Sequence, residues 1–240
     1  MMKDNEKKFT LPMLEAPRTL RVKFRKVGNL QYISHLDLQR TFSRVLVRAG
    51  LPLWYTKGFN PHIKMVFGMP LPVGAESECE LLDIRIEREM SCDEVKARLA
   101  AELTEELGVL EVYPAERKFS EIAFAAYDYT IKTAGDPAEN AARIRACLAG
   151  EALHIIKKGK AGEREVNILP LIREITVTAE GELVRMHAVL SAGEGNYLSP
   201  EALVSALREQ TGILSGNPTE EHYRILRRAA YLADGVTEFR

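Results

Sequence analysis

The sequence has little cysteine, and its three cysteines, Cys79, Cys92 and Cys147, include no CxxC pair. A zinc knuckle and an iron–sulfur cluster both need closely spaced cysteines, so neither a metal nor another cofactor is expected. The thiols are expected to be free in a reducing cytoplasm. No apolar run approaches the roughly 18 residues of a membrane span, and residues 1–17 lack the apolar core of a signal peptide. We therefore expect a cytoplasmic protein with a flexible leader over residues 1–17.

Several phosphate-binding and nucleophile motifs are also missing. The sequence has no GxxxxGK[ST] loop and no GxSxG turn, and Gly193-Glu194-Gly195 lacks the third glycine of a dinucleotide fold. Hydrophobic residues make up 46% and charged residues 28% of the chain, which is ordinary globular composition. A chain of 240 residues is long for one compact domain. It suits two domains of about 110 residues each.

The charge is nearly balanced overall, at −1, but its sign changes along the chain. Residues 18–70 contain ten Lys or Arg and one acid, Asp37, whereas residues 71–117 contain five basic and thirteen acidic residues. The total charge points to no partner. This segregation predicts a polar molecule with one basic face.

The first half has the periodicities of an α+β domain. Residues 19–26 alternate apolar and basic side chains, which predicts a half-buried strand. Ser34 is typical of a helix start, and apolar spacing predicts a helix that ends at Gly50. Further strands are expected at 51–56, 63–67, 80–87 and 109–113, and a second helix from the Ser91–Glu94 capping box to Gly108. The order β-α-β-β-α-β is that of a ferredoxin-like domain.

The second half repeats this pattern with weaker boundaries. Strands are expected at 124–132, 153–157, 171–178, 183–190 and 222–228, with a small one at 166–168, and helices from Asp136-Pro137 to Gly150 and from Ser199-Pro200 through Leu207. The expected fold class is α+β, with two ferredoxin-like (βαββαβ) domains in tandem. Their expected bounds are 18–119 and 120–240.

Three arginines, Arg40, Arg44 and Arg48, recur every four residues on the first expected helix, away from Phe42 and Leu46. Guanidinium groups bind phosphates well, so this stripe predicts contacts to an RNA backbone. Two alternatives stay open. The stripe is also what a solvated helix face would show, or a face docked against the acidic part of the same domain.

A second basic row lies on the outer face of the first expected strand, where Arg21, Lys23 and Arg25 alternate with apolar residues. In a ferredoxin-like sheet the first and third strands are antiparallel neighbours. The third expected strand carries Asp83, Arg85 and Glu87 on its outer face. Cross-strand ion pairs could therefore neutralise much of this row.

The segment from Lys57 to Lys64 (KGFNPHIK) combines glycine, proline, an aromatic residue, a histidine and two lysines. Gly58 allows the backbone to approach a ligand closely. The predicted RNA contacts are Lys57, His62 and Lys64 to phosphates, Asn60 and His62 by hydrogen bonds, and Phe59, or Trp54 and Tyr55, by stacking on a base. A rigid turn whose Pro and Gly only fix geometry is the alternative.

Two histidines in this half are candidates for catalysis. His35 and His62 could act as a general acid–base pair on a ribose hydroxyl and phosphate, with Lys57 stabilising charge. That arrangement would make a metal-independent ribonuclease. The alternative for His35 is a contact to the backbone of the first helical turn. Spacing alone does not bring the two rings together.

Three segments of the sequence resemble those of a known protein family. The run KGFNPHIKMVFGMPLPVGAESECELLDI, preceded by YISHLDLQRTFSRVLVRAGLPL, and the later VNILPLI resemble the uncharacterised radical-SAM-associated proteins of bacteria. These form a domain of unknown function encoded beside, or fused behind, radical SAM enzymes. The resemblance implies a radical SAM enzyme as a partner and establishes no reaction. The chain departs from fused members because it lacks the radical SAM domain, so it is not expected to be an enzyme on its own.

The leading hypothesis is an RNA-binding accessory protein that presents tRNA or rRNA to a radical SAM enzyme. Arg40, Arg44, Lys57 and Lys64 would neutralise phosphates in one shared groove. Paired ferredoxin-like domains also occur in RNA endonucleases that process CRISPR repeats, which resemble this chain at the level of expected fold alone. A metal-independent RNA endonuclease is therefore one alternative. A protein-docking module for the radical SAM partner, without RNA contact, is the other.

Overall fold

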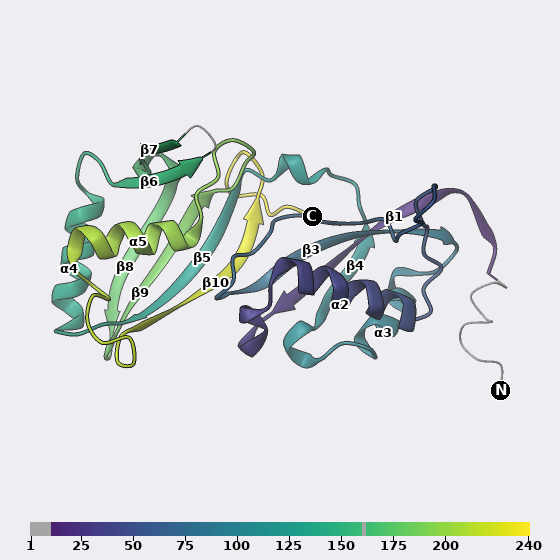
Figure 1. The fold of residues 1–240 in the computed structure, drawn as a ribbon, viewed down its shortest axis with the longest axis horizontal. Coiled ribbons are helices and arrows are strands. Elements are labelled where there is room, and N and C mark those ends of the chain that lie inside the picture. Colours follow the sequence, from purple (N-terminus) through teal and green to yellow (C-terminus); the bar gives the residue numbers. More distant parts are fainter. Residues whose placement is uncertain (1–10, 160–161) are drawn as a thin grey trace. The chain divides into compact units, whose positions relative to one another are not determined.

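The computed structural model describes residues 11–159 and 162–240, and the chain forms two compact units. The first unit ends at Phe119 and also includes Arg240, and the second covers residues 120–239. The helices and strands, all but β2 labelled in Figure 1, are β1 (Met13–Lys26), α2 (His35–Arg48), β2 (Met65–Phe67), β3 (Ala75–Arg88), α3 (Cys92–Ala100), β4 (Val109–Pro114), β5 (Phe124–Lys132), α4 (Pro137–Leu148), β6 (His154–Gly159), β7 (Gly162–Asn167), β8 (Ile172–Glu180), β9 (Leu183–Ser191), α5 (Pro200–Thr211) and β10 (His222–Tyr231). The fold is α+β, as expected.

The start of the chain differs from the expected leader. Residues 1–10 lie outside the described residues. β1 already begins at Met13, so residues 13–17 belong to a strand. The expected strand at 19–26 is the second half of this longer one.

The sheet of the first unit has the strand order β4-β1-β3-β2, and every pair is antiparallel. The expected pairing of the first and third strands is present, with Leu20 opposite Ile84 and Val22 opposite Leu82. Because side chains alternate along a strand, these apolar residues share one face. Helices α2 and α3 cover that face, where Phe42 and Leu99 join the same buried cluster.

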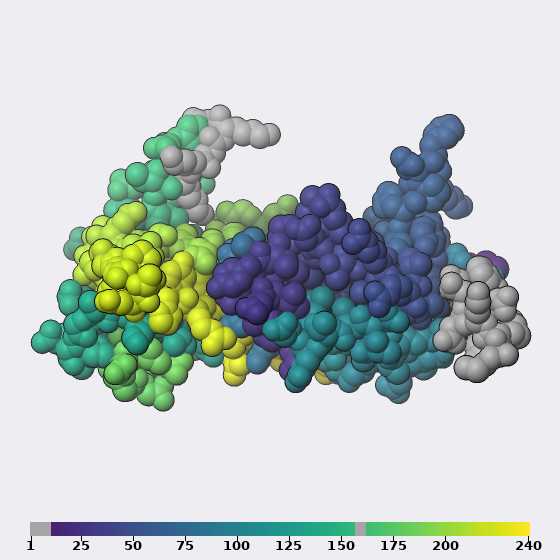
Figure 2. Space-filling model, turned by 60° about the horizontal axis from the view of Figure 1, so that its bottom comes forward, coloured from purple at the N-terminus to yellow at the C-terminus, as the bar shows by residue number. Residues whose placement is uncertain are grey.

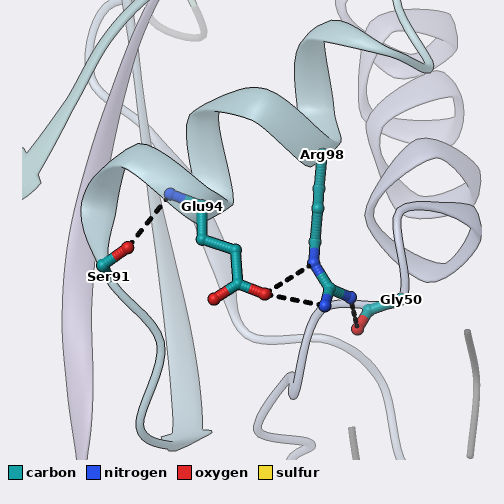
Figure 3. Close-up of polar contacts among 4 residues, drawn as sticks. All are labelled: Gly50, Ser91, Glu94 and Arg98. Carbon is teal, nitrogen blue, oxygen red and sulfur yellow. Dashed lines mark hydrogen bonds and ion pairs between the residues drawn. The ribbon is translucent and has the colours of Figure 1, made fainter. Parts of the chain in front are cut away.

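Both helices of this unit begin at the predicted caps. The Ser34 hydroxyl accepts a hydrogen bond from the Asp37 amide at 3.1 Å, and the Ser91 hydroxyl accepts one from the Glu94 amide at 3.1 Å. Figure 3 shows the second cap, together with Arg98, which contacts Glu94 and donates to the Gly50 carbonyl at 3.2 Å. These contacts tie α3 to the end of α2.

Two expected elements of the first unit are wrong in extent. Helix α3 ends at Ala100 and not before Gly108, and residues 105–107 form a separate 3₁₀ turn. The acidic residues after Ala100 would lie at the negative end of the helix dipole, which disfavours continuation. Residues 51–56 make only isolated bridges, Leu53 to Ile86 and Tyr55 to Ile63. The segment therefore switches its hydrogen bonds from one neighbour to the next and does not form a regular strand.

The second unit has the strand order β10-β5-β9-β8, again antiparallel throughout. Helix α4 lies against β8, β9 and α5, and Ile144 of α4 and Leu203 of α5 are fully buried. The strand expected at 153–157 is not part of this sheet. It forms β6, which pairs only with β7 in a separate two-stranded sheet. None of the helices among the described residues combines the length and apolar character needed to cross a bilayer.

Candidate nucleic-acid interface

A cavity of about 330 Å³ opens on the first unit. It lies on the side of the sheet away from α2 and α3, because Met65 and Phe67 of β2 pack against the buried cluster while Val66, between them, lines the cavity. The lining residues are Thr19, Lys64, Val66, Asp83, Arg85, Ala115, Glu116, Arg117 and Lys118. They come from β1, β2, β3 and the segment that follows β4.

The charge of this cavity is positive. Its lining includes four cations, Lys64, Arg85, Arg117 and Lys118, and all four side chains are exposed. It includes two acids, Asp83 and Glu116, and the Asp83 carboxylate already pairs with Arg21 at 2.7 Å. A concave surface with an excess of one sign of charge focuses the electrostatic field. The cavity therefore attracts anions.

The wall of the cavity is fixed by a buried arginine. Arg21 is 0% exposed, and its guanidinium donates to both carboxylate oxygens of Asp83 at 2.7 and 2.9 Å. The same group donates to the Arg117 carbonyl at 2.8 Å and lies 4.2 Å from the centroid of the Phe119 ring. Arg21 thus positions the segment that carries two of the four cations. The expected neutralisation of the first-strand row by Asp83 occurs at this residue.

The position of the Phe119 ring also explains why residue 68 is a glycine. A β-carbon at Gly68 would lie 2.7 Å from the Phe119 ring, too close for any side chain. The ring therefore packs between Arg21 and the backbone that follows β2. This contact adds a second anchor directly after the cavity cations Arg117 and Lys118.

The predicted loop is a hairpin that stands out from the first unit, in blue in Figure 2. Its base is closed by the Thr56 amide, which donates to the His62 carbonyl at 2.9 Å, and by the bridge between Tyr55 and Ile63. Phe59 stands at the tip and is fully exposed. Lys57 and Asn60 are also exposed. The hairpin presents an aromatic ring and a lysine to solvent, which is the arrangement predicted for RNA contact.

His62 has a structural role in this hairpin. Its Nδ1 lies 3.0 Å from the Thr56 hydroxyl and 3.3 Å from the Asn60 carbonyl, and its amide donates to the same hydroxyl at 3.1 Å. These contacts fold the tip back on its base. The alternative of a turn with fixed geometry thus describes part of what His62 does, and contact with RNA stays a prediction.

His35 and His62 do not form an acid–base pair among the described residues. The His35 ring contacts Gln39 at 3.2 Å and the Phe67 ring at 5.1 Å between centroids, whereas His62 contacts only its own hairpin. Within the described part of the chain, neither histidine contacts a carboxylate. Each ring is held by its own element, and catalysis by either histidine stays a prediction.

The three helix arginines differ from one another. Arg40 pairs with Asp37 at 3.2 Å and Arg48 pairs with Glu102 at 2.5 Å. Hydrogen bonds from Ser34 and Arg40 lower the pKa of the Asp37 carboxyl. Arg44 is exposed and has no ion-pair partner within the described part of the chain. The alternative of a helix face docked against the acidic part of the domain thus applies to Arg48. The charge of Arg44 is not offset by an ion pair within the described residues.

The predicted cations therefore fall into two groups. Lys64 lines the cavity on one side of the sheet, whereas Arg40, Arg44 and Arg48 lie on α2, which packs on the other side. The expectation of one groove shared by helix and loop is wrong for Lys64, and RNA contacts by the helix arginines stay a prediction. The physical reason is strand alternation, which directs Lys64 away from its neighbour Met65 and from the helix.

Sequence reasoning missed three cations of the cavity. Arg85 was counted only as part of the mixed row on the third strand, and Arg117 and Lys118 fall in the connection after the last strand. The available signal was the alternation of the third strand, which puts Arg85 on its outer face. Arg117 and Lys118 had no periodic signal, since a contact of Arg21 positions them.

Among the described residues, no group of three or more His, Cys, Asp or Glu is arranged to hold a metal ion.

A histidine–aspartate pair lies on the second unit, where His187 Nδ1 is 2.7 Å from Asp128 and Arg228 contacts the same carboxylate at 3.1 Å. The strand register places His187 directly opposite Asp128. This is a cross-strand pair of a partly exposed sheet face.

Comparison with known proteins gives a family and no function. No protein among the curated sequences matches the chain. A chain of the crystal structure of a Cbf5-Nop10-Gar1 complex is similar with a TM-score of 0.46 and 14% identity, over 88% of this chain and 48% of that one, so this chain spans about half of its length. An unknown protein from Galdieria sulphuraria is similar with a TM-score of 0.25 and 12% identity, over 88% and 99% of the two chains. Both scores are too low to support an argument. Residues 19–200 match a family described as uncharacterized protein conserved in bacteria (DUF2344), and the chain belongs to that family.

Proposed function

We propose that this protein binds RNA through the basic cavity of its first unit and serves as an accessory to a radical SAM enzyme in tRNA or rRNA modification. The observation that supports RNA binding is the meeting of Lys64, Arg85, Arg117 and Lys118 at one cavity. Phosphates bind to clustered Lys and Arg and release counterions when they do so. The exposed hairpin that precedes β2 carries Lys57 and Phe59, which are proposed as further RNA contacts.

The proposal includes a ferredoxin-like fold for each unit. The order β4-β1-β3-β2 with α2 and α3 fits a split β-α-β unit, and β10-β5-β9-β8 with α4 and α5 fits the same scheme. In the second unit the hairpin β6–β7 would then be an insertion between α4 and β8. The open sheet face of such a unit is free to bind a ligand.

RNA binding is tested by the salt dependence of affinity. The association constant of a labelled single-stranded RNA falls with salt by about 0.7 log units per log unit for each phosphate neutralised. The double variant Lys64→Ala with Arg85→Ala should reduce this slope by about 1.4, because two contacts are lost. A matched control replaces Lys96 and Arg208, which are exposed and lie outside the cavity. Equal losses in both double variants, or binding that is insensitive to salt, would contradict the proposal.

The radical SAM partner is proposed from the family resemblance, and an apolar surface near α2 supports a protein contact. Val47 and Tyr55 are 42% and 44% exposed and line a second cavity of about 240 Å³ with buried Leu51 and Leu53, and the charged residues Glu87 and Arg88 complete its lining. Exposed apolar surface of this kind favours a protein partner. This observation also supports the docking module as a second candidate function.

Co-purification with a radical SAM enzyme distinguishes the two candidates. A complex that survives nuclease and 1 M salt and is lost in Val47→Asp supports docking through this apolar surface. A complex that dissociates on nuclease treatment supports a bridge made by RNA. No association under either condition would refute the proposed partnership.

A further inference from the structure

Trp54 lies beside the basic cavity and is held on both sides by the backbone. Its amide donates to the Arg85 carbonyl at 2.9 Å, and its carbonyl accepts from the Lys64 amide at 3.3 Å. Leu53 bridges Ile86 on the helix-covered face. The Trp54 side chain lies on the open face with the cavity, because its ring contacts Arg85, whose side chain lines the cavity.

One residue, Arg85, both contacts the Trp54 indole and lines the cavity. The Arg85 guanidinium carbon lies 5.7 Å from the centroid of the Trp54 ring, and Arg85 also lines the cavity. Trp54 is only half-buried, although large aromatic residues usually bury most of their surface. Arg85 is thus placed to contact a phosphate while the neighbouring indole is accessible to a flat ring.

The size of the cavity limits the ligand. About 330 Å³ is at the low end of the range of roughly 300–1,000 Å³ for small-molecule sites. A single nucleotide unit fits such a volume, whereas a double helix would lie across its mouth. In a duplex the bases stack on each other, so their faces are closed to a protein side chain.

We infer that the site takes an unpaired nucleotide, with its phosphate among Lys64, Arg85, Arg117 and Lys118 and its base stacked on Trp54. The inference rests on the proposed function and specifies its ligand as single-stranded RNA. Base–aromatic stacking tolerates any base, because each base has a π-face. The site is therefore expected to select for strand state and not for sequence.

Trp54 is the only tryptophan in the chain, so its fluorescence reports on this site alone. The full-length protein is titrated with a single-stranded RNA hexamer, with the blunt duplex of the same sequence and with inorganic phosphate. The hexamer should quench the fluorescence with a saturating curve. The duplex and inorganic phosphate should each quench the fluorescence by less than a tenth of the quenching that the hexamer causes at saturation.

Variants test the stacking contact through the anisotropy of labelled RNA. Trp54→Ala should weaken hexamer binding by about 5- to 150-fold, the loss expected for one base stack, while leaving duplex binding within twofold. Trp54→Phe retains a ring and should recover most of the affinity, and unchanged duplex binding by Trp54→Ala excludes misfolding as the cause of its loss. Tyr32→Ala is the matched control. The Tyr32 side chain is 66% exposed and does not line the cavity, so this change should alter affinity less than twofold.

The outcomes separate the two proposals. Tight hexamer binding without quenching, or equal binding of duplex and hexamer, overturns the unpaired-nucleotide site and leaves RNA binding in place. A loss in Trp54→Ala that Trp54→Phe does not recover also overturns it. Absence of binding to either RNA overturns both proposals.

Discussion

Removal of Asp83 is a direct test of how the cavity wall is built. Arg21 is 0% exposed and Asp83 is 17% exposed, and two hydrogen bonds join them. Removing one partner of a buried ion pair costs about 3–5 kcal/mol, because the other charge is left without compensation. Since Asp83 retains some contact with water, Asp83→Leu should lie near the lower end, at about 3 kcal/mol.

The assay is urea unfolding followed by Trp54 fluorescence, which reports on the first unit. With a slope of about 2 kcal/mol per M, a loss of about 3 kcal/mol lowers the midpoint by about 1.5 M. Glu89→Leu is the control, because this exposed acid lies just after β3 and should change stability by less than about 0.5 kcal/mol. A double variant, Asp83→Leu with Arg21→Met, removes the uncompensated charge and should recover at least half of the loss.

Two results would refute this reasoning. One is a stability of Asp83→Leu within 1 kcal/mol of the parent protein, since about 3 kcal/mol is expected. The other is a double variant no more stable than Asp83→Leu alone. If the double variant folds as expected, it should still bind RNA more weakly, because Arg21 no longer holds the Arg117 carbonyl and the Phe119 ring.

Three further predictions concern other parts of the chain. Ser34→Ala removes the cap of α2 and should cost about 1 kcal/mol in urea unfolding, whereas Ser34→Asp should retain most of the stability. Phe42→Ala removes a fully buried ring that lies 4.7 Å from Phe24 and should cost about 3–5 kcal/mol in the same assay. In the second unit, hydrogen bonds from the Thr237 hydroxyl and from the Val236 and Thr237 amides lower the pKa of Asp234 to about 2. A lowered pKa stabilises the fold above the ordinary value of 3.8 and loses that effect as the pH falls toward 2, so thermal unfolding of Asp234→Asn should depend less on pH across this window.

The elements predicted best were those marked by two independent signals. The helix after Ser34 has both a cap and an apolar stripe, and the structure places it at His35–Arg48. The strand at 124–132 has an alternating core face between clear boundaries, and it is reproduced residue for residue. Where the apolar periodicity was the only signal, tertiary contacts decided which sheet a segment joined. Residues 153–157 have strand propensity, yet they pair with β7 and not with the main sheet, which no local pattern specifies.

The residues of the candidate site were predicted in type more than in position. A basic loop with an aromatic ring available for stacking could be inferred from KGFNPHIK, because glycine and proline favour turns through local backbone geometry. The cavity could not, because it depends on the long-range contact of Arg21 with Asp83, 62 residues apart, and with the Arg117 carbonyl, 96 residues apart. A pattern along the chain contains no information about such distances.

The positive charge of residues 18–70 illustrates why charge counted along a sequence does not define a surface. Arg21 is buried against Asp83, Arg48 is paired with Glu102, and Lys64 lies on the opposite side of the sheet from α2. The cations that remain together come instead from sequence-distant segments, including the acidic region 71–117 that supplies Arg85 and Arg117. An RNA strand that follows the cavity should therefore be insensitive to Arg44→Ala, within about twofold, because that arginine lies on α2. A loss in Arg44→Ala as large as that in Lys64→Ala would mean that RNA passes around the edge of the sheet, and the bound segment would have to be longer than the cavity alone requires.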